Sequence, residues 1–289
     1  MIDAEGRMQL ITMVRSAMAA ALLSVPVLGV NPGERITLRQ GFPFVDITIN
    51  GRGPFHMLLD TGASASLLTP KAAQAAGLEF DHRVILTTLA GEKIVPGASD
   101  NTVEIAGTEE TGLTILALDL PEVRALDHNA DGVLGQSFLS RNPYLLDYDR
   151  KRLWIGSSAT ELALQLPNSV TATQSRGRVV LPVSLDPDGR VWQLTLDSGS
   201  TNLIVDCSDR CPRAWGVERD SRVVTHAGER SVRRGTLRMV ALGGSTMPAA
   251  NAVLLDGVAA EGWGDGLLPT RWFSAFYVSE NTVRFAPAR

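Results

Sequence analysis

The sequence predicts an all-β fold that is divided into two similar lobes and contains few short helices. Two observations lead to this prediction. Short apolar runs alternate with turn residues along the chain, which contains 27 Gly and 15 Pro. In addition, a pattern of strand, turn, strand and acidic turn occurs once in each half. With 289 residues, the chain is long enough for two modest domains of this kind.

The first 30 residues differ in composition from the rest of the chain and predict a signal peptide. Residues 16–30 are apolar apart from two serines, and Arg7 and Arg15 precede them. This stretch is short for a membrane span but suits the apolar part of a signal peptide. Asp3 and Glu5 are unusual in such a leader, so an uncleaved membrane anchor and a helix of the mature protein stay open. We expect export to the periplasm or out of the cell.

Residues 31–157 form the predicted N-terminal lobe. Strands at Val45–Gly51 and Phe55–Leu59 lead into the turn Asp60-Thr61-Gly62-Ala63-Ser64. A short helix follows, with Thr69 as its N-cap, Pro70 as its first residue and Gly77 as its end. Further strands are expected at residues 84–88, 94–96, 101–105 and 113–118.

Residues 177–289 repeat this order as the predicted C-terminal lobe, after a polar linker at residues 158–176. Strands at 181–186 and 191–196 lead into the turn Asp197-Ser198-Gly199-Ser200-Thr201. The lobes also end alike, because Asp131–Gly135 and Asp265–Pro269 each precede a short helical turn and a terminal hairpin. Such a repeat predicts two lobes related by a pseudo-twofold axis.

The two acidic turns are the candidate functional site. Asp60 and Asp197 each follow an apolar strand and would be partly buried, which costs free energy unless the carboxylate is hydrogen-bonded. Each turn also supplies a hydroxyl next to the Asp, a glycine that lets another backbone approach, and a second hydroxyl that can bind the carboxylate. These supporting residues are Thr61, Gly62 and Ser64 in the first turn, and Ser198, Gly199 and Thr201 in the second.

One Asp-Thr-Gly turn alone is usually structural, but two at equivalent places of a repeat predict chemistry. If the two lobes pack about a twofold axis, Asp60 and Asp197 meet there. Two adjacent carboxylates do not both ionise easily, so they share one proton and titrate with one low and one raised pKa. The ionised partner can then take a proton from water while the protonated partner donates to a carbonyl oxygen.

These motifs resemble the active-site loops of the aspartic peptidase superfamily, whose paired carboxylates are the known example of such a shared proton. The sequence of Phe55–Ser64 most resembles bacterial retropepsin-like proteins. Asp131–Gly135 is similar to the family's apolar segment that packs beneath the catalytic loop. The likeness covers roughly residues 35–289. It implies two pepsin-like or retropepsin-like β-barrel lobes, and a contact of Thr61 and Ser198 across the lobe interface.

The resemblance has two departures. Pro269 stands where the family has glycine, so the second loop is expected to be built differently. The flap hairpin of pepsin-like enzymes carries a tyrosine, whereas the hairpin at the equivalent place, residues 87–96, has none. Its tip, Ala90, Gly91 and Glu92, is the candidate flap, with a plain surface hairpin as the alternative.

The remaining composition limits cofactors and partners. A net charge of -4 without a basic stripe makes nucleic acid an unexpected partner. The four histidines are scattered without metal-ligand spacing, so we expect neither a metal nor another cofactor. Cys207 and Cys211 would form a disulfide in an exported protein and free thiols otherwise. Both acidic motifs lie in one chain, which predicts a monomer.

The resulting functional hypothesis is an aspartic endopeptidase acting on polypeptide substrates, with Asp60 and Asp197 as its catalytic pair. One alternative is a catalytically silent protein that uses the same cleft to bind a peptide or polymer. Another is a structural or adhesive β-sandwich module, which leaves the duplicated acidic turns unexplained.

Overall fold

β-Strands dominate the structure, a computed structural model, and account for 57% of it against 12% for helices. This confirms the all-β, two-lobed prediction. The structure describes residues 32–88, 91–186, 189–225, 228–247, 250–255 and 264–288, with side chains left out at 214–231. The predicted signal peptide at residues 1–30 lies outside these ranges. Within them, no helix has the length and apolar character needed to cross a membrane.

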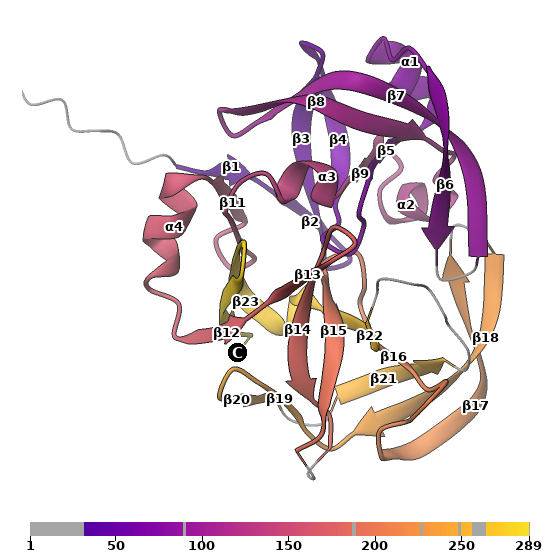
Figure 1. The fold of residues 1–289 in the computed structure, drawn as a ribbon, viewed down its shortest axis with the longest axis vertical. Coiled ribbons are helices and arrows are strands. Elements are labelled where there is room, and N and C mark those ends of the chain that lie inside the picture. Colours follow the sequence, from indigo (N-terminus) through magenta and orange to yellow (C-terminus); the bar gives the residue numbers. More distant parts are fainter. Residues whose placement is uncertain are drawn as a thin grey trace, which may run out of the picture. The chain divides into compact units, whose positions relative to one another are not determined.

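The N-terminal lobe is an eight-stranded sheet in the order β2-β3-β4-β9-β5-β8-β7-β6. An additional pairing of β3 with β7 curls this sheet toward a barrel. Figure 1 shows these strands in indigo to magenta. Their bounds are β2 Thr37–Arg39, β3 Phe42–Ile49, β4 Arg52–Leu59, β5 Ser66–Leu68, β6 His82–Thr88, β7 Gly91–Ile105, β8 Thr108–Ala117 and β9 Gly132–Leu134.

The C-terminal lobe is a ten-stranded sheet in the order β17-β18-β21-β16-β22-β15-β14-β19-β20, with β13 paired to β14. Figure 1 shows most of these strands in orange to yellow. Their bounds are β13 Thr173–Ser175, β14 Arg178–Ser184, β15 Val191–Asp197, β16 Leu203–Asp206, β17 Ala214–Thr225, β18 Gly228–Leu237, β19 Val240–Leu242, β20 Ser245–Met247, β21 Ala250–Leu255 and β22 Gly266–Pro269.

The strands that carry the two acidic turns are paired in the same way in both lobes. In the N-terminal lobe, β4 is parallel to β9, which is antiparallel to β5, and β5 is parallel to β8. In the C-terminal lobe, β15, β22, β16 and β21 repeat these three pairings in the same order and sense. The sequence repeat is therefore also a repeat of topology.

A six-stranded sheet in the order β1-β11-β10-β23-β24-β12 joins the lobes. At its centre, β10 from the first half of the chain pairs with β23 from the second, and Leu146 is opposite Phe276. Both side chains are fully buried, so this pairing is part of the main core. The bounds are β1 Glu34–Arg35, β10 Tyr144–Asp147, β11 Arg152–Ile155, β12 Asn168–Thr171, β23 Phe273–Ser279 and β24 Thr282–Pro287.

The described helices are short, as predicted. They are α1 Pro70–Ala75, α2 Pro121–Leu126, α3 Gln136–Leu139, α4 Ser157–Ala163 and the 3-10 turn η1 Thr270–Trp272. The side chain of Thr69 caps α1 by accepting from the N–H of Ala72, and Gly77 follows the helix with a φ of +70°. The segment expected to be a linker, residues 158–176, instead contains most of α4 together with β12 and β13, and β12 pairs with β24.

Candidate active site

Asp60 and Asp197 lie at the ends of equivalent strands. Asp60 directly follows β4, and its N–H donates to the carbonyl of Leu134 at 3.0 Å. Asp197 is the last residue of β15 and lies opposite Pro269 of the parallel strand β22. In each lobe, a buried apolar strand therefore delivers one carboxylate to the lobe interface.

The two acidic turns are packed directly against each other. A Cβ atom added at Gly62 would lie 2.6 Å from Cγ of Asp197, and one added at Gly199 would lie 2.6 Å from Cγ of Asp60. Only glycine leaves room for the opposite carboxylate at these two positions. The two carboxyl groups lie close enough that the charge of Asp60 raises the pKa of Asp197, so the structure brings the two predicted residues into one site.

Thr61 and Ser198 connect the turns by four hydrogen bonds across the interface. The hydroxyl of Thr61 donates to the carbonyl of Leu196 at 2.8 Å and accepts from the N–H of Ser198 at 3.0 Å. The hydroxyl of Ser198 donates to the carbonyl of Leu59 at 2.6 Å and accepts from the N–H of Thr61 at 2.9 Å. Both side chains are buried, so each lobe supplies hydrogen-bond partners that the other lobe needs.

Backbone N–H groups of each acidic turn donate to Oδ1 of its own carboxylate. Oδ1 of Asp60 accepts from Gly62 at 2.9 Å and from Ala63 at 3.1 Å. Oδ1 of Asp197 accepts from Gly199 at 2.7 Å. The first carboxylate thus has two backbone donors, whereas the second has one.

The hydroxyls of Ser64 and Thr201 were expected to hydrogen-bond the carboxylates, and in the described part of the chain they do not. Both residues line the cleft above the carboxylates, but within the described ranges no hydrogen bond joins either hydroxyl to Asp60 or Asp197. Thr201 instead accepts from the side-chain amide of Asn202 at 3.0 Å.

The pKa of Asp197 is raised well above its ordinary value. Burial is the main cause, and the charge of Asp60 and the hydrogen bond to it raise this pKa further. The N–H of Gly199 and the positive charge of Arg178 oppose the shift. Burial and the neighbouring charge therefore favour the protonated form of Asp197.

Comparison with known proteins agrees with this geometry. Residues 45–138, which include Asp60 and the segment Asp131–Gly135, match the family model described as aspartyl protease. This segment of the chain is similar to aspartyl proteases. This assignment indicates a protease-type function in coarse terms. No curated protein matches the chain.

The two lobes support their turns differently. In the first lobe, a Cβ at Gly135 would lie 2.3 Å from the carbonyl oxygen of Ala65, so the loop passes too close for any side chain. Pro269 occupies the equivalent position in the second lobe, as the sequence shows. There the turn is held by Ser200, whose hydroxyl donates to the carbonyl of Asn202 at 2.9 Å and accepts from its N–H at 3.3 Å.

Two pairs of buried polar side chains beneath the turns escaped sequence reasoning. Gln136 donates to the carbonyl of Thr61 at 3.0 Å and to the hydroxyl of Tyr144 at 3.4 Å. At the equivalent place of the second lobe, the hydroxyl of Thr270 is bonded to that of Tyr148. Gln136 and Thr270 each directly follow the repeated Asp-Gly segment, which is a signal that could have identified them.

The carboxylates lie in a cleft of about 370 Å³. The hairpin of β6 and β7 contributes Leu86, Thr87 and Thr88 to the lining. In the candidate flap, Gly91 and Glu92 begin β7 opposite Thr88 and Thr87, while Ala90 lies outside the described residues. The predicted hairpin therefore borders the cleft.

Arg178 is a cleft residue that sequence reasoning missed. It is 7% exposed, lines the cleft with the two carboxylates, and donates from Nε to the carbonyl of Gly62 at 2.8 Å. Burial lowers the pKa of its guanidinium, whereas the charges of Asp60 and Asp197 raise it. An arginine stays protonated in a protein, so the site contains a buried positive charge.

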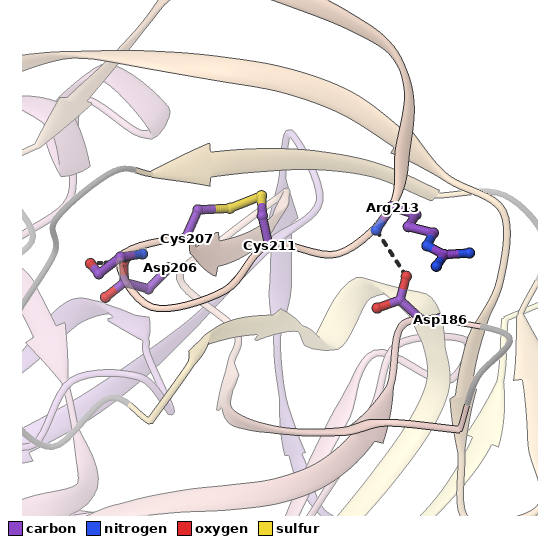
Figure 2. Close-up of a disulfide and its surroundings, with 6 residues drawn as sticks. Asp186, Asp206, Cys207, Cys211 and Arg213 are labelled. Carbon is purple, nitrogen blue, oxygen red and sulfur yellow. Dashed lines mark hydrogen bonds between the residues drawn. A yellow bond between two sulfur atoms is a disulfide. The ribbon is translucent and has the colours of Figure 1, made fainter.

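Outside the cleft, the cysteines are paired. Figure 2 shows the disulfide between Cys207 and Cys211 in the loop after β16, with the N–H of Arg213 donating to Asp186 at 2.8 Å farther along. Among the described residues, no group of three His, Cys, Asp or Glu side chains could hold a metal ion. His56 is stacked on Phe44 and bonded to Asp46 at 2.6 Å, which fits a structural role.

We predict that Ser198→Ala lowers stability because it leaves the carbonyl of Leu59 and the N–H of Thr61 buried without a partner. The expected loss is about 2 kcal/mol in the free energy of unfolding, measured by urea denaturation. Ser64→Ala is the matched control, because Ser64 lines the cleft outside this contact. Equal stabilities of the two variants would contradict a stabilising contact between the lobes.

The raised pKa of Asp197 predicts how stability varies with pH. The folded protein binds this proton more tightly than the unfolded chain, so the resulting stabilisation is complete below the unfolded pKa of about 4 and is lost as pH rises through the folded pKa. Asp197→Asn removes the titration. Thermal unfolding between about pH 3 and 8 should show the wild type losing stability relative to this variant. Parallel curves would show that the pKa is not raised.

Proposed function

We propose that the chain is an aspartic endopeptidase that hydrolyses peptide bonds with water activated between Asp60 and Asp197. The observation that carries the proposal is the packing of each carboxyl group against the glycine of the opposite acidic turn, at the lobe interface and inside one cleft. The similarity to aspartyl proteases supports the reaction class. Hydrolysis by a proton-sharing pair needs no other cofactor.

The two carboxylates have different roles in this proposal. Ionised Asp60 accepts a proton from water while the water oxygen bonds to the carbonyl carbon, and Asp197 donates its proton to the carbonyl oxygen. The product is a tetrahedral diol. When the C–N bond breaks, Asp60 passes its proton to the leaving nitrogen and Asp197 recovers a proton from the diol. No covalent bond to the protein forms at any step.

The cleft lining suits a polypeptide substrate with apolar side chains. Phe42, Leu58, Leu86, Ile204 and Leu267 lie around the carboxylates, and apolar walls of this kind bind extended segments through side-chain burial. Because one chain supplies both acidic turns, we propose an active monomer. The hairpin of β6 and β7 is proposed as the flap that closes over the substrate.

A catalytically silent binding protein is the second candidate. Its cleft would gain nothing from two adjacent carboxylates of which Asp197 is buried and Asp60 half-buried, because desolvation and mutual repulsion raise the free energy of the ionised pair. We also propose export from the cytoplasm. The disulfide of Cys207 and Cys211 supports this, because disulfides persist mainly in oxidising compartments.

The proposed activity is tested by exposing a broad peptide library to the wild type, Asp60→Asn and Asp197→Asn. Both variants should lose about 10³-fold or more in kcat/KM, because the carboxylates act as one unit. Asp149→Asn, at an exposed position, controls for the acid-to-amide change. Peptide binding without cleavage by the wild type would favour the silent binding protein.

The proposed flap is tested at Gly91, whose φ of +132° strains any other residue. Gly91→Val should lower kcat/KM several-fold, because it alters the hairpin end beside the cleft, and the strain should lower the melting temperature of this variant and of its control alike. Gly107→Val is the matched control, since Gly107 also has a positive φ and has no atoms within 4 Å of an added Cβ. Equal kinetics of the two variants would leave the hairpin as a surface element.

A further inference from the structure

Two hairpins enter the cleft region at pseudo-twofold related places. In the C-terminal lobe, β13 and β14 are joined by Arg176 and Gly177, which both have positive φ, and Ser175 is opposite Arg178. In the N-terminal lobe, β2 and β3 are joined by Gln40 and Gly41, again with positive φ, and Arg39 is opposite Phe42. Both are two-residue turns of the type that suits a tight hairpin.

Phe42 and Arg178 are therefore equivalent residues of the two lobes. Each is the first residue of its strand, and each lines the cleft. The first lobe forms this hairpin with an apolar side chain, so the barrel itself does not require a charge here. The fold therefore does not need the positive charge of Arg178, and its role is to be sought in the site.

The position of Arg178 shows what its charge balances. Its Nε donates to the carbonyl of Gly62, inside the turn that holds Asp60, and its charge acts on both Asp60 and Asp197. A buried guanidinium is costly unless a negative charge compensates it. A carboxylate pair with one proton has a charge of -1, which compensates one arginine.

An alternative role for Arg178 is to bind an acidic side chain of the substrate. The charge count disfavours it. A substrate carboxylate at Arg178 would place a second negative charge beside the ionised pair, and like charges at short range repel strongly. The balance already reached within the site is the more favourable state.

We propose that Arg178 is a positioning residue that balances the single negative charge of the Asp60–Asp197 pair and ties the first catalytic turn to the C-terminal lobe. This inference rests on the proposed function. Among the residues that the structure describes, the other charged or titratable groups near the pair are Arg176 beside Arg178, Glu122 in the cleft lining, and Tyr148, on which the charges of Asp197 and Arg271 act.

The proposal predicts the direction in which the pH profile of cleavage moves when the charge of Arg178 is removed. A positive charge favours the ionised form of a carboxylate, so it lowers both pKa values of the pair. The singly protonated pair is the active form, and it exists between those two values. Removal of the charge should therefore move both limbs of the pH profile of kcat/KM to higher pH, by about one unit.

The experiment compares Arg178→Gln, Arg178→Lys and the control Arg176→Gln, which removes an exposed charge two residues away. One readout is the pH profile of kcat/KM, and the other is the ¹³C carboxyl titration of the pair by NMR in the intact chain. Arg178→Gln should shift both, whereas Arg178→Lys and Arg176→Gln should match the wild type. If circular dichroism shows that Arg178→Gln is unfolded, Arg178→Phe, which copies Phe42, replaces it.

The outcomes separate this proposal from the proposed function. An unshifted titration in the neutral variant overturns the charge balance, and so does an equal shift in Arg178→Lys. If the wild type cleaves no peptide but the carboxyl titration of Arg178→Gln is still shifted relative to it, the charge balance is upheld and the peptidase assignment is overturned. Selective loss of cleavage next to acidic residues, with an unchanged pH profile, would identify Arg178 as a substrate-binding residue instead.

Discussion

The candidate site depends on two carboxyl groups that are packed close together where the lobes meet. Asp60 and Asp197 can approach each other only because Gly62 and Gly199 have no side chain to obstruct the opposite carboxylate. Their closeness is unfavourable in itself, since both are removed from water and repel each other when ionised. The cross-lobe bonds of Thr61 and Ser198 and the core around the six-stranded sheet hold them together against this repulsion. Packing energy from elsewhere in the fold thus maintains a reactive arrangement.

The site is less symmetric than the fold that forms it. The repeated strand pairings place the two carboxylates at equivalent positions. Their hydrogen-bond donors and the cleft residues around them differ. Asp60 has two backbone donors and Asp197 has one, which separates the preferred positions of charge and proton. Arg178 and Phe42 extend this asymmetry to the cleft lining. Two adjacent carboxylates share one proton even when they are identical, and such a difference in surroundings favours one of them as the site of the proton.

Much of the site could be predicted because its chemistry is local in the sequence. The acidic turns, their glycines and the flanking apolar strands are contiguous, and their repetition identified Asp60 and Asp197 as a pair. The exceptions have physical reasons. Ser64 and Thr201 were expected on the carboxylates, but the described hydrogen bonds to Oδ1 of each Asp come from backbone N–H groups, and no residue type indicates the direction of an N–H group. The linker was predicted from polar composition, yet its strand β12 forms through pairing with β24, which is distant in sequence.

The sequence by itself determined the all-β class, the duplication and the residues of the two turns, because alternation, turn residues and motifs are properties of neighbouring positions. Only the tertiary structure decided that the turns meet, that burial raises the pKa of Asp197, and that Arg178 lies beside them. Burial and the hydrogen bond from Arg178 to Gly62 depend on distances between segments far apart along the chain. Those distances result from the packing of the two lobes, and no local pattern records them.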